Sequence, residues 1–255
     1  MTKTRPDTAR TAGASGPAGR SASVSSIFFK YFFAPSTHTV YRDPELYDDG
    51  VLSRLSRRDH LARVVADVVI EHHSPVPTVS ALDVGAGTGI LTLELARRGL
   101  TVVGLDKFGE ALEMLQTKAA RDGLDSLLHS VQADMNDRLP FPPSSFDIVT
   151  SLRANRYITD LGHLLSEIAR VLRPGGLFVF PVFWVDAVSW RRRSERGFRQ
   201  ETSVRAVAEA INATALRVVA KTPFSQVPAK DDQPRGVPFY YRPVFIIATK
   251  PPAPN

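Results

Sequence analysis

The chain has 255 residues, of which 43% are apolar, which is enough for one well-filled α/β domain with extensions but short for two. Its 32 basic and 26 acidic residues give a formal charge of +6, a mild excess that does not select a polyanionic partner. There is no cysteine, which excludes disulfides, thiolate catalysis and cysteine-based zinc sites. The longest apolar run, 177–185, is about half of the roughly 18 residues that suggest a membrane span. We therefore expect a soluble protein.

The N-terminal part of the chain has a biased composition. Residues 1–26 are rich in Ala, Ser, Gly, Thr and Arg, contain one acidic residue, Asp7, and show no helical or strand periodicity. This is typical of a disordered tail in a cytoplasmic protein; the alternative is a transit peptide, which would place the protein in the mitochondrial matrix. The aromatic stretch SIFFKYFF at 26–33 is predicted to be a flap packed over the body of the protein, with a membrane-surface foot or a partner-binding helix as alternatives.

The rest of the chain alternates helical and strand patterns. Apolar residues at helical spacing over 52–71 predict an amphipathic helix. We then expect strands at 79–85, 100–106, 128–134, 146–152 and 177–184, helices at 90–99, 109–123 and 161–176, where RPGG stops the last helix, and finally a helix near 201–213 and strands at 216–224 and 243–250. This alternation predicts a mainly parallel sheet with helices on both faces, and the last two strands are expected to pair antiparallel.

The stretch LDVGAGTG, residues 82–89, ends the first of these strands and leads into a helix. Ligands of open α/β sheets bind at the carboxyl ends of the strands, where this loop lies. Its G-x-G-x-G spacing departs from the G-x-G-x-x-G of dinucleotide sites, because Ile90 stands where the third glycine would be, and no GK[ST] follows to make a P-loop. A carboxylate at the mouth of the loop, from Asp83, would repel a pyrophosphate and attract an ammonium or sulfonium group. The loop therefore predicts a nucleoside with a cationic end.

Two further strand ends carry acidic residues. Asp106 follows the second strand, where a carboxylate can accept hydrogen bonds from both hydroxyls of a ribose. Asp134 follows the third, where it can accept from an adenine amino group, and the adjacent Met135 can cover the face of the ring. Each acid alone is a weak signal. Together and in this order they favour an adenosine ligand.

The chain resembles the class I S-adenosylmethionine-dependent methyltransferases, in the type 11 group that includes the ubiquinone- and menaquinone-methylating enzymes. The resemblance covers about residues 40–250 and rests on four motifs: ALDVGAGTGILTLELARRG, VVGLD, VQADMNDRLPFPPSSFDIVTS and EIARVLRPGG. It implies S-adenosylmethionine as the cofactor and a Rossmann-like, doubly wound α/β fold. The sheet is expected to have seven strands, mostly parallel with an antiparallel last strand.

The resemblance also implies the parts that residues play. Asp83, Gly85 and Gly87 are expected to contact the methionine portion of the cofactor, with Gly89 completing the cofactor-binding loop. Asp106 is expected to hold the ribose, Lys107 the edge of the nucleoside, and Asp134 and Met135 the adenine. The segment ELYD at 45–48 resembles the part that closes over the cofactor in relatives, which makes Tyr47 a lid candidate.

The same resemblance suggests how the chain is divided. After the tail at 1–26, we expect a single methyltransferase domain over 27–255. Within it, we expect an N-terminal helical lid at 27–75, a cofactor-binding core at 76–185, and a C-terminal helix and strand pair at 186–255.

The methyl acceptor is less well indicated. Substrate-side candidates lie after the fourth strand in SLRANRYITD, where Arg156 could hold an acidic group and Tyr157 could orient a hydroxyl. Many relatives carry His at the stretch that matches these two residues, so a His base there is in doubt. The [DN]PP[YF] motif of amine-methylating nucleic-acid enzymes is absent, and the six histidines show no metal-ligand spacing, so we expect no metal.

One basic cluster leaves the class of acceptor open. WRRRSERGFRQ at 190–200 holds five arginines and could contact phosphates, belong to the acceptor pocket, or be a solvated segment. We predict a methyltransferase that modifies the O, N or C of a small organic molecule. The alternatives are an RNA methyltransferase, which the transit-peptide alternative would place in an organelle, and a non-catalytic assembly factor with the same fold.

Overall fold

The computed structural model describes residues 58–73, 79–152, 154, 157–183, 204–223 and 243–252. Several predictions lie outside these residues and stay predictions: the tail, the aromatic flap, the lid candidate Tyr47, the substrate-side candidate Arg156 and the basic cluster at 190–200. Within the described part of the chain, no helix is long and apolar enough to cross a membrane.

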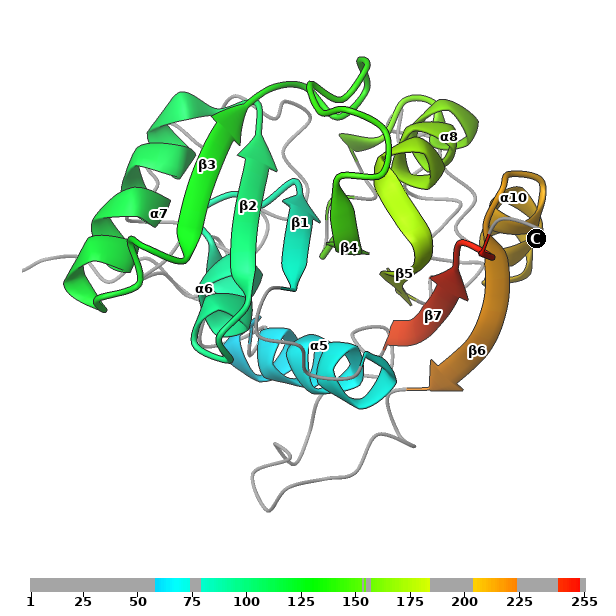
Figure 1. Cartoon of the computed structure of the whole chain (residues 1–255), viewed down its shortest axis with the longest axis horizontal. Coiled ribbons are helices and arrows are strands. Elements are labelled where there is room, and N and C mark those ends of the chain that lie inside the picture. The colour runs from blue at the N-terminus through cyan, green and yellow to red at the C-terminus, as the bar shows by residue number, and fades with distance from the viewer. Residues whose placement is uncertain are drawn as a thin grey trace, which may run out of the picture.

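A seven-stranded sheet forms the centre of the molecule (Figure 1). Its strands are β1 (Ser80–Val84), β2 (Thr101–Asp106), β3 (Leu128–Gln132), β4 (Phe146–Thr150), β5 (Leu172–Phe183), β6 (Arg217–Pro223) and β7 (Pro243–Thr249). They lie in the order β3-β2-β1-β4-β5-β7-β6, and the first five are parallel. β7 runs antiparallel to both of its neighbours. The prediction of a mostly parallel, doubly wound sheet with an antiparallel last strand is confirmed.

Helices cover both faces of this sheet. They are α5 (Arg58–His72), α6 (Ile90–Ala96), α7 (Gly109–Arg121), α8 (Leu161–Val171) and α10 (Val204–Asn212). Buried residues of α5, α6 and α7 share one hydrophobic cluster with the sheet, and those of α8 and α10 share a second. Alternate strand residues supply the two clusters, since Leu177 and Val179 of β5 join the first and Phe178 and Phe180 join the second.

The connection from α8 to β5 differs in detail from the prediction. RPGG at 173–176 was expected to separate the helix from the strand. Instead, α8 ends at Val171 and β5 begins with the next residue. The register between β4 and β5 shifts between Phe146 and Ile148, which places RPGG in a bulge of β5. The helix does stop here, but the chain joins the sheet before the glycines.

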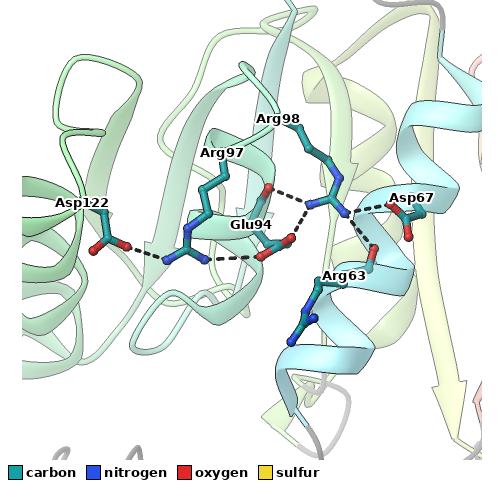
Figure 2. A network of polar contacts seen from close by, with 6 residues as sticks. All are labelled: Arg63, Asp67, Glu94, Arg97, Arg98 and Asp122. Carbon is teal, nitrogen blue, oxygen red and sulfur yellow. Dashed lines mark hydrogen bonds and ion pairs between the residues drawn. The ribbon is translucent and has the colours of Figure 1, made fainter. Parts of the chain in front are cut away.

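An ionic network joins α5, α6 and α7, the three helices that share the first hydrophobic cluster (Figure 2). Arg98, just after α6, lies 2.7 Å from the Asp67 carboxylate of α5 and also binds the carboxylate of Glu94. Arg97 binds the other oxygen of Glu94 at 3.3 Å and reaches Asp122 at the end of α7. The side chains of Arg98 and its two partners are at most about one-third exposed, so water screens these pairs less than isolated surface pairs. The network therefore fastens α5 to the rest of the fold.

We expect Arg98→Met to lower the free energy of unfolding by about 1–2 kcal/mol, because it leaves two carboxylates without their shared partner. The control is Arg205→Met, which removes a pair in α10 that is mostly exposed and should change stability little. Urea unfolding of both variants measures the difference. Equal stability of the two variants would contradict a fastening role for Arg98.

Candidate functional site

The glycine loop follows β1 and turns tightly at the carboxyl edge of the sheet. Gly85, Gly87 and Gly89 all have positive φ, at 76°, 55° and 86°. The backbone N–H groups of Gly85 and Ala86 donate to the carbonyl of Leu105 in β2, at 2.8 and 2.9 Å. The loop therefore bends over the end of β2, and a left-handed backbone at alternate positions is the reason that the sequence needs glycine there.

Two of these glycines also face close neighbours. A Cβ on Gly85 would lie 2.6 Å from the Cβ of Ala154, in the segment that follows β4. A Cβ on Gly89 would lie 2.0 Å from a methyl carbon of Leu115 in α7. The contact at Gly85 brings the loop against the predicted acceptor-side segment. Packing of α7 accounts for the glycine at 89, whose assignment to the cofactor stays a prediction.

Asp106 connects the end of β2 to the glycine loop. One carboxylate oxygen accepts from the N–H of Gly87 at 2.8 Å, and the other accepts from the N–H of Phe108 at 3.0 Å. Burial raises the pKa of this carboxyl group, and the backbone N–H donors oppose that rise. A carboxylate has about four acceptor positions, and backbone N–H groups of Phe108, Gly87 and Lys107 act on this one, so capacity for about one further donor remains. The arrangement can accept a hydroxyl group of a ligand.

Asp83 lies deeper than its predicted place at the mouth of the loop. Its side chain is buried, with the residue only 2% exposed, because two hydroxyl groups hold the carboxylate inside. Thr92 of α6 donates to one oxygen at 2.8 Å, and Thr150 of β4 donates to the other at 3.2 Å. Burial raises the pKa of Asp83 to about 6, more than these hydrogen bonds lower it. Asp83, which was predicted to lie at the mouth of the loop, is thus a buried carboxylate beneath it.

Asp134 and Lys107 lie together at the ends of β3 and β2. The Lys107 ammonium is 3.7 Å from one Asp134 oxygen, and Asn136 donates two hydrogen bonds to the other. Burial raises the pKa of Asp134, but the Asn136 hydrogen bonds and the nearby Lys107 outweigh it, so the pKa is lowered overall. Asp134 is therefore an ionised, partly exposed acceptor at the edge where the nucleoside was predicted.

Met135, which was predicted to cover the face of the adenine ring, is largely buried in the protein interior. It is 8% exposed and belongs to the second hydrophobic cluster. Its sulfur is 3.9 Å from the position of a Cβ on Gly85, so it packs beside the glycine loop. Its predicted contact with adenine stays a prediction.

Tyr157 lies in the segment after β4 and packs, partly buried, against the second cluster. Its carbonyl accepts from the side-chain amide of Asn136 at 3.1 Å. The other end of that amide accepts from the N–H and hydroxyl of Thr159, at 2.7 and 2.9 Å. Asn136 thus ties the acceptor-side segment to the cofactor-side carboxylate Asp134.

Three residues that support the site were not predicted from the sequence: Asn136, Thr92 and Thr150. Asn136 stands two residues after Asp134, a spacing at which an Asx-type turn forms, and this signal was present in QADMND. Neither threonine carries such a signal, because each reaches Asp83 only through the packing of α6 and β4 on β1. Among the described residues, no group of three or more His, Asp or Glu could hold a metal ion.

Comparison with known proteins identifies the domain. Residues 82–180 match the family model described as a methyltransferase domain. The comparisons support a class I S-adenosylmethionine-dependent methyltransferase domain over these residues. The matched residues run from the glycine loop through β5, so they include every described residue of the predicted cofactor site.

The proteins to which this chain is similar are named for several different methyl acceptors. A ubiquinone biosynthesis O-methyltransferase of Sodalis glossinidius is 28% identical over 131 residues, which is 51% of this chain and 52% of that protein. A cypemycin N-terminal methyltransferase of a Streptomyces species is 33% identical over 140 residues, 52% of this chain and 55% of that protein. The chain therefore spans about half the length of the curated relatives it matches.

A solved structure shares the fold of this methyltransferase. The geranyl diphosphate C-methyltransferase of Streptomyces coelicolor, in complex with Mg²⁺, geranyl-S-thiolodiphosphate and S-adenosyl-L-homocysteine, superposes with a TM-score of 0.59. The match covers 72% of this chain and 74% of that one at 18% identity. At this identity the likeness concerns the fold alone.

We expect Asp83→Asn to stabilise the ligand-free protein above about pH 6 by up to about 3 kcal/mol. The pKa of Asp83 is higher in the folded state than in the unfolded chain, so its favourable contribution is present in acid and is lost as the pH rises through about 6. Asparagine keeps an acceptor and removes the buried charge.

Urea unfolding at about pH 5 and about pH 7.5 measures this effect, which should be larger at the higher pH. The control is Asp147→Asn, since Asp147 is paired with Arg173 and has a lowered pKa, so its loss should destabilise the protein. A destabilising effect of Asp83→Asn at about pH 7.5 would contradict this account of Asp83.

We expect Gly89→Ala to be much more destabilising than Gly99→Ala, although both glycines have φ of 86°. An alanine at 99 meets nothing within 4 Å and pays only the cost of the left-handed backbone, about 1 kcal/mol. An alanine at 89 must also displace Leu115, which we expect to add about 2 kcal/mol or more. Thermal unfolding of both variants checks this. Equal losses would show that α7 shifts freely.

Proposed function

We propose that this protein transfers the methyl group of S-adenosylmethionine to the O, N or C of a small organic molecule. The observation that carries the proposal is the Asp106 carboxylate, which is bound to the glycine loop at the end of β2 and keeps acceptor capacity for a hydroxyl group of a ligand. The family match over the loop and the five parallel strands supports the same reaction.

The residues at the carboxyl edge of the sheet fit this cofactor. Asp106 would accept from a ribose hydroxyl, and the left-handed glycine loop leaves backbone rather than side chains toward the methionine portion. Asp134, ionised beside Lys107, would accept from the adenine amino group. Met135 and Gly89 would support the nucleoside side and the loop from within the fold.

The bound cofactor would supply a methyl group already activated by a positive sulfur. What remains for the chain is to align the acceptor atom with that methyl group, and such alignment can account for roughly 7–11 kcal/mol of a reaction barrier. A general base is needed only when the acceptor does not lose its proton alone. We propose Arg156 and Tyr157 as acceptor-side residues, since Tyr157 lies in the segment that meets the loop at Gly85.

The names of relatives favour a small acceptor. They include a ubiquinone biosynthesis O-methyltransferase, although one relative is named for an N-terminal methylation of cypemycin. The test is incubation with methyl-labelled cofactor and separate pools of small metabolites, RNA and protein. We expect label in the small-molecule pool. Label in RNA alone would support the RNA-methylating alternative, and cofactor binding without transfer to any pool would support the assembly-factor alternative.

We expect Asp106→Asn to weaken the binding of S-adenosylhomocysteine by about 10- to 100-fold, because it replaces a charged hydrogen bond to the ribose with a neutral one. Isothermal titration calorimetry measures this change. The control is Asp125→Asn, an exposed carboxylate in the turn before β3, which should leave affinity unchanged. Unchanged affinity in Asp106→Asn would remove the ribose-binding role from this residue.

A further inference from the structure

The most unusual polar group of the described residues is the buried carboxylate of Asp83. It ends β1 immediately below the glycine loop, between Thr92 in the first turn of α6 and Thr150 at the end of β4. All three residues are at most 2% exposed. We call this arrangement the Asp83 clamp. It joins two strands and a helix at the point where the loop begins.

The charge of Asp83 lacks a cation of its own. Among the described side chains, no Lys, Arg or His forms an ion pair with it, and its hydrogen-bond donors are the hydroxyls of Thr92 and Thr150 and the backbone N–H of Thr92, all neutral. The charged group that acts on it is Asp106 on the neighbouring strand, which is another carboxylate. A neutral side chain would join the same elements without the cost of burying a charge. The hydrogen bonds of the clamp therefore do not explain why residue 83 is a carboxylate.

We propose that Asp83 is a positioning residue whose charge, held beneath the loop by Thr92 and Thr150, makes the site prefer the cationic sulfonium donor to its neutral thioether product. This inference rests on the proposed function. Because the carboxylate is buried and hydrogen-bonded within the fold, in this proposal its charge acts across the loop and not through the direct contact with the methionine portion that the resemblance implied. In a water-poor interior, attraction between a fixed negative charge and a positive sulfur is much stronger than in solution. Loss of the methyl group removes that positive charge and with it the attraction, which favours product release.

The preference should depend on pH. Asp83 is faced by Asp106 from β2, Thr150 from β4 and Thr92 from α6, and burial raises its pKa to about 6. Above that pH the carboxylate is ionised and attracts the sulfonium. Below it the carboxyl group is neutral and the attraction is lost. Binding of the cationic donor stabilises the ionised form, so it should release a proton near pH 6, whereas binding of the neutral product should release less.

The test compares the affinities of the full-length protein for S-adenosylmethionine and S-adenosylhomocysteine at about pH 7.5 and about pH 5.5, by calorimetry. For the wild type, we expect the ratio of the two affinities to fall by up to about four-fold at the lower pH, because a carboxyl group with a pKa of about 6 is about one-quarter ionised there. In Asp83→Asn, the ratio should already be low at the higher pH and should not change with pH. A merely structural role would weaken both ligands equally and leave their ratio unchanged.

Two further variants keep the test decisive. Thr92→Val removes one donor to the carboxylate without changing the side-chain shape, so the pH at which the preference is lost should rise; this remains measurable if Asp83→Asn does not fold. Asp147→Asn removes a carboxylate at the opposite edge of the sheet, where Ser80 begins β1, and should leave the ratio unchanged.

The outcomes separate the two proposals. If the wild type binds neither ligand, the proposed function fails and this inference fails with it. If the wild type binds both ligands but Asp83→Asn has the wild-type ratio at each of the two pH values, only the inference is overturned. A Thr92→Val midpoint that does not rise would likewise overturn it.

Discussion

The hydrogen bond between the N–H of Gly87 and the carboxylate of Asp106 is the interaction on which the site depends. β1 and β2 are parallel neighbours, so the loop after one and the acid after the other reach the same edge of the sheet. The bond sets the loop against the acid. Because Gly87 has positive φ, its N–H points toward Asp106 without the steric cost that a side chain would impose. The glycine loop and the Asp106 carboxylate are thus held together as one unit.

This unit costs stability. Asp83 and Asp106 lie on adjacent strands, both are buried, and burial raises the pKa of each. Two carboxylates in a poorly solvated edge repel each other, and backbone and hydroxyl donors offset only part of the cost. The large hydrophobic clusters on the two sheet faces supply the stability that allows it. A cationic ligand would relieve the repulsion between these carboxylates. The interaction that destabilises the free protein would therefore favour binding of a cationic ligand.

The sequence predicted the features that depend on local residue patterns. Alternating strand and helix patterns predicted the sheet and its antiparallel end, and alternate glycines predicted the tight loop. It was less informative where tertiary packing decides. Nothing local to Asp83 indicates that Thr150, distant in sequence, closes over it, so a carboxylate expected in the open is buried. In the same way, nothing local to Gly89 indicates that a side chain there would meet Leu115 of α7.

The predicted cofactor residues and the predicted acceptor-side residues follow different strands of the sheet. The loop, Asp106 and Asp134 follow β1, β2 and β3, whereas the segment with Tyr157 follows β4. Asn136 bonds to both Asp134 and the Tyr157 segment, so a shift of the nucleoside edge would be passed to the acceptor side through a rigid amide. Ala154 against Gly85 forms a second connection, made by packing. Under the proposed function, alignment of the acceptor with the cofactor would therefore depend on these two contacts.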